Sequence, residues 1–148
     1  MAREFKGRPV MPGSFTGEAL VSRQGMNILA SVQKDVMAEH RTITCADQNN
    51  PDLYGKVLTG KIICLPRTIG STTGGMLLQL TAKQGSGPAA LLFAETIDSL
   101  ALAGVVLAKV WYGKAIVAGD GLGPDFLGSV QDGVPVSISE DGTVRIEE

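Results

Sequence analysis

The residues with the clearest capacity for chemistry lie at positions 67–75, where the chain reads RTIGSTTGG. Three hydroxyl side chains, those of Ser71, Thr72 and Thr73, stand here between glycines. Apolar residues before this stretch predict a strand, and a helical pattern begins near Thr73, so several backbone N–H groups at the helix start have no helical partner. These groups and the positive end of the helix dipole favour a carboxylate or a phosphate. The candidate substrate-binding residues are Arg67, Gly70, Thr72, Thr73, Gly74 and Gly75.

A purely structural role for these residues is also open. No lysine follows the glycines as in GxxxxGK[ST], and the GxGxxG spacing is absent, so the standard nucleotide motifs do not apply. Ser71 or Thr72 alone could serve as a helix cap, which is a very common use of such residues. Paired glycines in a first helical turn argue for a further reason, because each costs about 1 kcal/mol relative to alanine. Arg67 either pairs with a substrate carboxylate or lies solvated in the loop.

The apolar pattern around this stretch predicts an α/β domain with a central βαβαβ portion. Strands are expected at 61–66, 89–93 and 115–118, and a first helix ends at Gly85 as a C-cap would require. Strands joined through helices in this way are parallel, with right-handed crossovers. The second helix, over residues 97–108, is apolar nearly all round, and it should therefore be deeply buried or shared with a partner.

The two ends of the chain are expected to form β-ribbons. Residues 4–10 and 18–22 read as strands around a turn, and alternation over 134–146 with Asp141-Gly142 in the middle predicts a hairpin. Residues 26–36 are ambiguous but could be helical, and residues 46–52 form a polar loop that could contribute ligand contacts. No linker is visible, so residues 1–148 are expected to form one domain.

Composition excludes several functional classes. With a net charge of −2 and no cluster of Lys or Arg, nucleic acid is not an expected partner. The longest uncharged apolar segment, 99–108, is far shorter than the roughly 20 residues of a membrane span. Charges at positions 3, 4 and 6 of the first ten residues indicate no signal peptide. A reducing cytoplasm is the expected compartment.

Cysteine and histidine are scarce, so this chain is poorly equipped for metal binding. Cys45 and Cys64 are too far apart for a CxxC site and too few for a disulfide scaffold. Cys64 is expected to be a buried apolar residue within a strand. His40, the one histidine, is expected at the solvated surface, and nothing places it beside Ser71 as a catalytic triad would require.

Four segments in order resemble one known family. They are PGxxxGEALVSR from Pro12, LYGKxLxGKI over 53–62, LPRxxGSTxG over 65–74, and the AxxLAG-type second helix. Together they resemble the small subunit of aconitase X over nearly the whole chain, with residues 53–75 the most specific part. The resemblance implies the single swivelling β/β/α domain of the aconitases, which agrees with the α/β prediction.

The resemblance also implies a chemistry. Aconitase X enzymes resemble hydro-lyases in which a large subunit carries an iron or iron–sulfur centre and the small subunit closes over a small-molecule substrate. The serine that matches Ser71 is the implied catalytic base, and this chain itself would bind no metal. A serine alkoxide needs stabilisation, which free N–H groups at a helix start can provide. Iron, as a Lewis acid, would take the departing hydroxyl group.

Family members divide between dehydration of cis-3-hydroxy-L-proline and dehydration of phosphomevalonate. The archaeal type of turn usually has a glycine or a basic residue where this chain has Thr68-Ile69, and this difference favours cis-3-hydroxy-L-proline. The small subunit of phosphomevalonate dehydratase is the alternative. A phosphocarrier would need a histidine at the turn, which is absent. A non-catalytic, homo-oligomeric anion-binding swivelling domain stays open.

Overall fold

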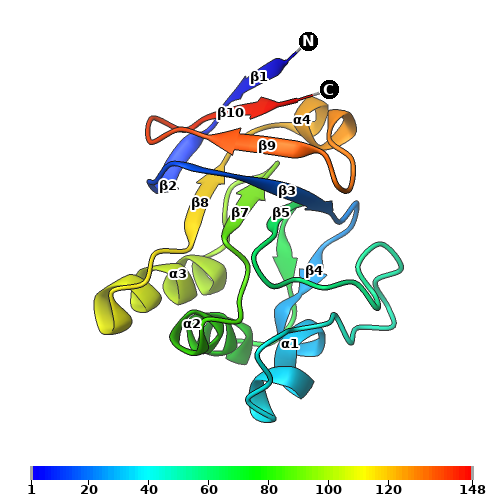
Figure 1. Cartoon of the computed structure of the whole chain (residues 1–148), viewed down its shortest axis with the longest axis vertical. Helices are drawn as coiled ribbons and strands as arrows, with labels where there is room; N and C mark the ends of the chain where they lie inside the picture. Colours follow the sequence, from blue (N-terminus) through cyan, green and yellow to red (C-terminus); the bar gives the residue numbers. More distant parts are fainter. Residues whose placement is uncertain (1, 148) are drawn as a thin grey trace.

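A computed structural model describes residues 2–147 and contains a parallel core of four neighbouring strands (Figure 1). The strands are β3 (Phe15–Val21), β5 (Ile62–Leu65), β7 (Ala90–Phe93) and β8 (Val117–Asp120). Two helices connect the last three of them, α2 (Thr73–Gln84) and α3 (Ser99–Tyr112). The predicted βαβαβ portion is therefore confirmed, and Gly85 ends α2 in the left-handed conformation with φ of 72°.

Antiparallel strands extend this core at both edges, in the order β1-β10-β9-β3-β5-β7-β8-β2. They are β1 (Arg3–Lys6), β2 (Arg8–Met11), β9 (Pro135–Ile138) and β10 (Thr143–Ile146). The C-terminal hairpin is confirmed, but the single strand expected over 4–10 is two strands that pair at opposite edges. They separate at Gly7, whose backbone N–H donates to Gly142 O at 2.9 Å and where a Cβ would lie 2.9 Å from Asp120 O.

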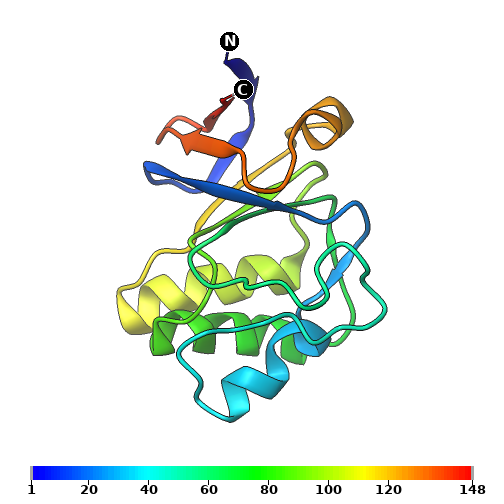
Figure 2. The same cartoon turned by 45° about the vertical axis from the view of Figure 1, so that its right-hand side comes forward.

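The molecule has three layers, as Figures 1 and 2 show. Helices α1 (Ile28–Met37), α2 and α3 cover one face of the parallel strands, and the β9–β10 ribbon lies with α4 (Pro124–Ser129) on the other. Alternate residues of each strand feed two separate cores. Ile63 and Leu91 pack with the helices, whereas Ile62 and Leu92 pack toward the ribbon. This arrangement is the β/β/α architecture expected from the sequence.

The segment between β3 and β5 brings α1 to the functional stretch. The two-residue strand β4 (Met26–Asn27) pairs in parallel with β6 (Thr68–Ile69), and α1 follows at once. Asn27 caps α1 by accepting a hydrogen bond of 3.0 Å from Ala30 N. The ambiguous segment is thus helical, and its first turn lies beside residues 68–71.

Two features of the loops were not predicted. Asn50, within the polar loop, is fully buried and donates to Ser22 Oγ at 3.0 Å, so it organises the loop from inside. Helix α4 begins at Pro124, where proline suits a first helical position, and buries Phe126. The glycines at 121 and 123 concealed this short helix in the sequence.

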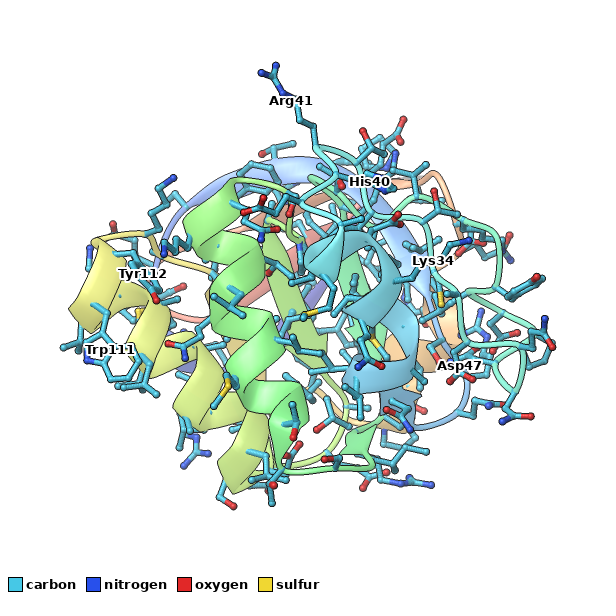
Figure 3. The ribbon with its side chains drawn as sticks, turned by 90° about the horizontal axis from the view of Figure 1, so that it is seen from below. Lys34, His40, Arg41, Asp47, Trp111 and Tyr112 are labelled. Carbon is cyan, nitrogen blue, oxygen red and sulfur yellow. The ribbon has the colours of Figure 1, made fainter. Side chains whose placement is uncertain are left out.

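Helix α3 is only half buried. Ala101, Gly104, Val105 and Ala108 face the core, whereas Val106, Val110 and Trp111 are exposed on a surface patch that we call the α3 face. Trp111 and Tyr112 lie at the C-terminal end of α3, on the side of the molecule opposite Lys34 and Asp47 (Figure 3). The sequence predicts that this helix is either deeply buried or shared with a partner, and the prediction of deep burial within the chain is wrong. None of the helices described here is long and apolar enough to cross a membrane.

Candidate active site at the start of two helices

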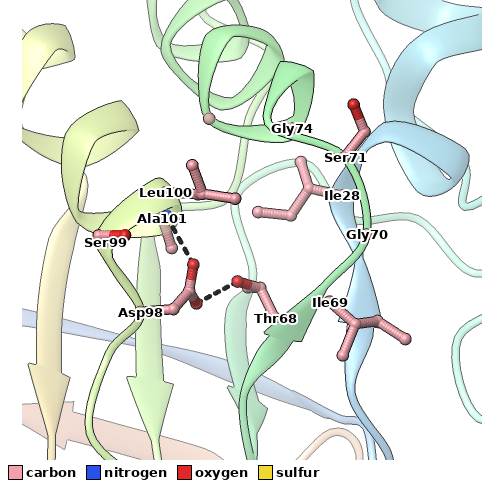
Figure 4. A pocket seen from close by; sticks show the side chains of 11 residues that line it. Ile28, Thr68, Ile69, Gly70, Ser71, Gly74, Asp98, Ser99, Leu100 and Ala101 are labelled. Atoms are coloured by element: carbon pink, nitrogen blue, oxygen red, sulfur yellow. Dashed lines mark hydrogen bonds between the residues drawn. The ribbon is translucent and has the colours of Figure 1, made fainter.

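A cavity of about 180 Å³ lies where α2 and α3 begin, beyond the carboxyl ends of β5 and β7 (Figure 4). Ligand sites in parallel α/β sheets commonly lie at this edge, because the loops that follow the strands meet there. The cavity is lined by Ile28, residues 68–71, Gly74, Gly75 and residues 98–101. It therefore combines the predicted turn with the first turn of α3.

The structure brings some of the candidate site residues to this cavity and leaves others outside it. Gly70, Ser71, Gly74 and Gly75 are among the residues that line the cavity. Thr72 and Thr73 are exposed at the start of α2 and are not among them. Arg67 lies outside as well. Its guanidinium pairs with Glu95 at 2.7 Å, and both side chains are about half exposed.

Ser71 is exposed, and its hydroxyl oxygen accepts a hydrogen bond of 3.1 Å from Thr73 N. The Ser71 carbonyl oxygen accepts another from Gly74 N at 3.0 Å. Thr72, which stands at the N-cap position, makes no side-chain capping bond, and the first turn of α2 contains no acidic residue. Among the described residues, no side chain forms a hydrogen bond to the Ser71 hydroxyl, so the helix start is what polarises it.

Two glycines at this site have identifiable steric reasons. Gly70 has φ of 102°, and a Cβ there would lie 2.8 Å from the Asn27 side chain, which caps α1. A Cβ on Gly75 would overlap the carbonyl oxygen of Leu100, because α2 and α3 touch at this point. Gly74 is different, since its Cβ would make an ordinary contact of 3.5 Å with Ile28. Close packing of helices thus accounts for Gly75 without a ligand.

Asp98 is the site residue that sequence reasoning missed. Its Oδ2 accepts a hydrogen bond of 3.0 Å from Ala101 N and caps α3, while its Oδ1 accepts one from the Thr68 hydroxyl. Figure 4 shows both bonds at the wall of the cavity. Asp98 and Ser99 directly before an apolar helix are a typical N-cap signal, which the sequence offered. Of the residues that line the cavity, Asp98 is the charged one, and none is Lys, Arg or His.

A buried carboxylate at the end of β8 positions the segment that leads to Asp98. Asp120 accepts two hydrogen bonds from Arg8, at 2.9 and 2.6 Å, and one of 2.8 Å from Ile97 N. Burial alone would raise the pKa of Asp120, but the bonds from Arg8 and Ile97 N hold it below its ordinary value. The charged form of Asp120 therefore anchors the start of α3.

His40 belongs to a different part of the surface (Figure 3). Its Nδ1 lies 2.6 Å from Asp35 Oδ1, and Asp35 Oδ2 accepts a hydrogen bond from Thr44 N at 2.8 Å. The bond with His40, followed by that from Thr44, lowers the pKa of Asp35. The histidine is exposed, as expected, but it has a partner. It does not line the cavity beside Ser71.

Metal-binding side chains do not gather anywhere in the described part of the chain. Within residues 2–147, no three His, Cys, Asp or Glu side chains come together in a group that could hold a metal ion. Cys45 and Cys64 are both buried and free. Burial raises the pKa of the Cys64 thiol, which keeps it protonated and inert, as its predicted place within a strand implies.

Comparisons with known proteins agree with one another. The chain matches a family model described as the aconitase X swivel domain over residues 4–146. The phosphomevalonate dehydratase small subunit of Pyrococcus furiosus is 32% identical over 107 residues, covering 72% of this chain and 74% of that protein. Its counterpart in Methanosarcina mazei is 31% identical over 103 residues, covering 70% and 67%. The crystal structure of Thermococcus kodakaraensis aconitase X in its holo-form matches with a TM-score of 0.82 at 26% identity, covering 99% of both chains.

Proposed function

The chain belongs to the aconitase X swivel-domain family, and we propose that it is the small subunit of a hydro-lyase that dehydrates a hydroxylated carboxylic or amino acid. Relatives named as dehydratase small subunits support this proposal. The observation that carries it is the exposed Ser71 hydroxyl on the wall of a cavity, at a helix start that has no acidic residue in its first turn and no side-chain cap from Thr72. The family match over residues 4–146 also supports the proposal that residues 1–148 form one swivelling domain.

We propose that Ser71 is the catalytic base. Both substrates considered for this family carry a hydroxyl group on the carbon next to the one that bears the carboxylate. The Ser71 alkoxide would take the proton from the carbon beside the carboxylate, and the electron pair of that C–H bond would become the second bond of C=C. The C–O bond at the next carbon breaks, and the hydroxyl group leaves with the bonding electron pair and takes up a proton from solvent to become water. Ser71 then holds the abstracted proton as a neutral hydroxyl.

Serine is a weak base, so its alkoxide must be stabilised by the protein. Thr73 N already donates to the Ser71 oxygen, and the positive end of α2 lies directly behind it. Because the first turn of α2 contains no acidic side chain, nothing on this helix offsets that positive potential. The remaining free N–H groups of the turn would hold the substrate carboxylate.

The described residues of this chain do not fit an iron centre, since no group of three ligating side chains is present among them. We therefore propose that the iron or iron–sulfur centre belongs to the large subunit, where it would supply Lewis-acid chemistry. The two cysteines, both buried and free, are in keeping with the reducing cytoplasm that we propose as the compartment.

We propose a large aconitase X subunit as the partner. Ile69, which lines the cavity, and Met76, in the first turn of α2, are 51% and 58% exposed, which is a large fraction for apolar side chains. The α3 face adds Val110 and Trp111, at 69% and 60%. Exposed apolar surfaces of this kind are typical of protein interfaces. A partner that covers the rim would also close the cavity over the substrate.

For the substrate we propose cis-3-hydroxy-L-proline first. The residues that line the cavity offer one carboxylate, Asp98, and no cationic side chain, which suits an amino acid better than a phosphate ester. The names of the curated relatives favour 5-phosphomevalonate as the second candidate. The test is to reconstitute the complex with its large subunit and assay both compounds. Turnover of the phosphorylated compound alone would exclude our first choice.

A further inference from the structure

Two helices, α2 and α3, begin at the same cavity, and each helix start can hold an anion. Both helices run in the same direction because they connect parallel strands. Gly75 and Gly104 bring their backbones into direct contact. A ligand in a cavity of about 180 Å³ is therefore exposed to the potential of both helix starts at once.

The two helix starts differ in charge. That of α3 already has an anion, the Asp98 carboxylate, which accepts a hydrogen bond from Ala101 N at 3.0 Å. The Thr68 hydroxyl holds the other oxygen of this carboxylate, so the side chain is fixed at both ends. The start of α2 has neither an acidic residue nor a side-chain cap from Thr72. The start of α2 is thus capped by the neutral Ser71 hydroxyl, on Thr73 N, whereas the start of α3 is capped by a carboxylate of the protein itself.

No positive side chain compensates for Asp98 at the cavity. None of the residues that line it is Lys, Arg or His. Arg67, which directly precedes the cavity residue Thr68, is paired with Glu95 at 2.7 Å. A second anionic group on the ligand would therefore lie close to a fixed carboxylate without a counter-ion from this chain.

We infer that Asp98 is a specificity-determining residue, which admits substrates with a single anionic group and rejects phosphorylated ones. This inference rests on the proposed function, because it assigns the cavity to the substrate. The substrate carboxylate binds at the start of α2. The side of the cavity next to Asp98 takes a neutral or positively charged group, such as the ring ammonium of a cyclic amino acid.

The test compares two anions on the reconstituted complex, in wild type and in Asp98→Asn. Asparagine caps helices about as well as aspartate does, with its one side-chain oxygen accepting from Ala101 N, and its NH2 group can donate to the Thr68 hydroxyl oxygen, so the variant removes the charge and keeps both contacts. Calorimetric binding of glycolate and of phosphoglycolate gives a ratio of affinities that does not depend on turnover. We expect Asp98→Asn to improve phosphoglycolate relative to glycolate by roughly ten-fold or more. The ratio of kcat/KM for 5-phosphomevalonate over cis-3-hydroxy-L-proline should rise in the same direction.

Two further variants make the result specific. Asp98→Ser, which also keeps a cap without a charge, should shift the ratio in the same direction. Asp125→Asn removes an exposed carboxylate from the first turn of α4, away from the cavity, and should leave the ratio unchanged. An unchanged ratio in both Asp98 variants, or binding of neither anion, overturns the inference. Absence of all turnover alongside the expected binding shift would instead count against the proposed reaction.

Discussion

The Ser71 hydroxyl oxygen accepts a hydrogen bond of 3.1 Å from the backbone N–H of Thr73, at the start of α2. The same atom that caps the helix is thus the atom proposed to take the substrate proton. The bond fixes the direction of the hydroxyl and would stabilise its alkoxide. Removing this oxygen should lower the stability if Ser71 caps the helix, and should lower the rate of turnover if Ser71 is the base. The two roles can therefore be separated by experiment.

Ser71→Ala should abolish turnover of the reconstituted complex by about 10²-fold or more, because no other group on α2 replaces the base. The free energy of unfolding should fall by roughly 0.5–2 kcal/mol from the lost cap. Substrate binding should largely survive, since the backbone N–H groups remain. Steady-state kinetics and denaturant unfolding measure the two effects. Thr72→Ala and Thr73→Ala are the controls and should lose much less activity. A folded Ser71→Ala complex with more than about a tenth of wild-type kcat would withdraw the base assignment.

Gly75→Ala should lower the free energy of unfolding by about 1–3 kcal/mol, because its Cβ would overlap the Leu100 carbonyl oxygen and push α2 from α3. Gly74→Ala is the matched variant. Its Cβ would meet Ile28 at an ordinary 3.5 Å, and alanine is the better helix former by about 1 kcal/mol. Urea unfolding of the isolated chain compares the two. Equal stabilities would contradict the helix contact described here.

The isolated chain should be inactive and free of stoichiometric iron, and it should form a stable complex with the large subunit. The reason is that its described residues offer no group of three ligating side chains. Iron analysis and activity assays on the chain purified alone, and again after mixing, check this prediction. Full dehydratase activity of the chain by itself would reject the two-subunit proposal.

Val110→Asp should weaken association with the large subunit by roughly ten-fold or more, because it places a charge on the apolar α3 face. Val110 is 69% exposed, so the isolated chain should keep its stability within about 0.5 kcal/mol. Val57→Asp, at an exposed valine outside this face, is the control. Association measured by calorimetry should distinguish them. Equal affinities would show that the partner does not cover the α3 face.

Stability should fall in acid partly through Asp120. Its pKa is lowered in the folded protein, so its contribution is present above the ordinary aspartate pKa of 3.8 and is lost as the pH falls through the lower folded value. Asp120→Asn should cost about 1–3 kcal/mol at pH 7 and should flatten the decline below about pH 4. Urea unfolding at several pH values measures this. Asp125→Asn, which removes an exposed carboxylate, is the control and should show the same dependence of unfolding free energy on pH as wild type. If the unfolding free energy of Asp120→Asn falls in acid as steeply as that of wild type, the role assigned to Asp120 is contradicted.

Local patterns in the sequence were enough to predict the parallel core strands and the glycine-rich turn over residues 70–75. The apolar run ending at Leu65, the helical period after Thr73 and the cap at Gly85 each depend on neighbouring residues, and each is found. The contact of Asp98 with Thr68 joins residues 30 positions apart through the short strand β6. No pattern among neighbouring residues indicates that these two side chains come into contact.

The same limit applies to two other residues of the site. The sequence predicts Gly75 as a substrate-binding residue, whereas in the structure it packs against Leu100 of α3, a contact between helices that local sequence does not specify. For Arg67 the sequence allows either a substrate carboxylate or solvent, whereas in the structure the guanidinium pairs with Glu95, which follows β7. Both contacts exist because neighbouring parallel strands place the loops that follow them side by side. They can therefore be predicted only once the order of the strands in the sheet is known.

The pairing of the first strands with the last ones has a consequence for biosynthesis. Residues 62–120 contain the parallel strands β5, β7 and β8 and can close their contacts over short loops as soon as they leave the ribosome. Strand β1 must wait for β10, because Arg3 pairs with Ile146. Phe15 of β3 likewise meets its partner, Ile138, only after the segment that contains β9 has been synthesised. The helix layer can therefore form during translation, whereas the ribbon layer closes last, in a slow step of high contact order.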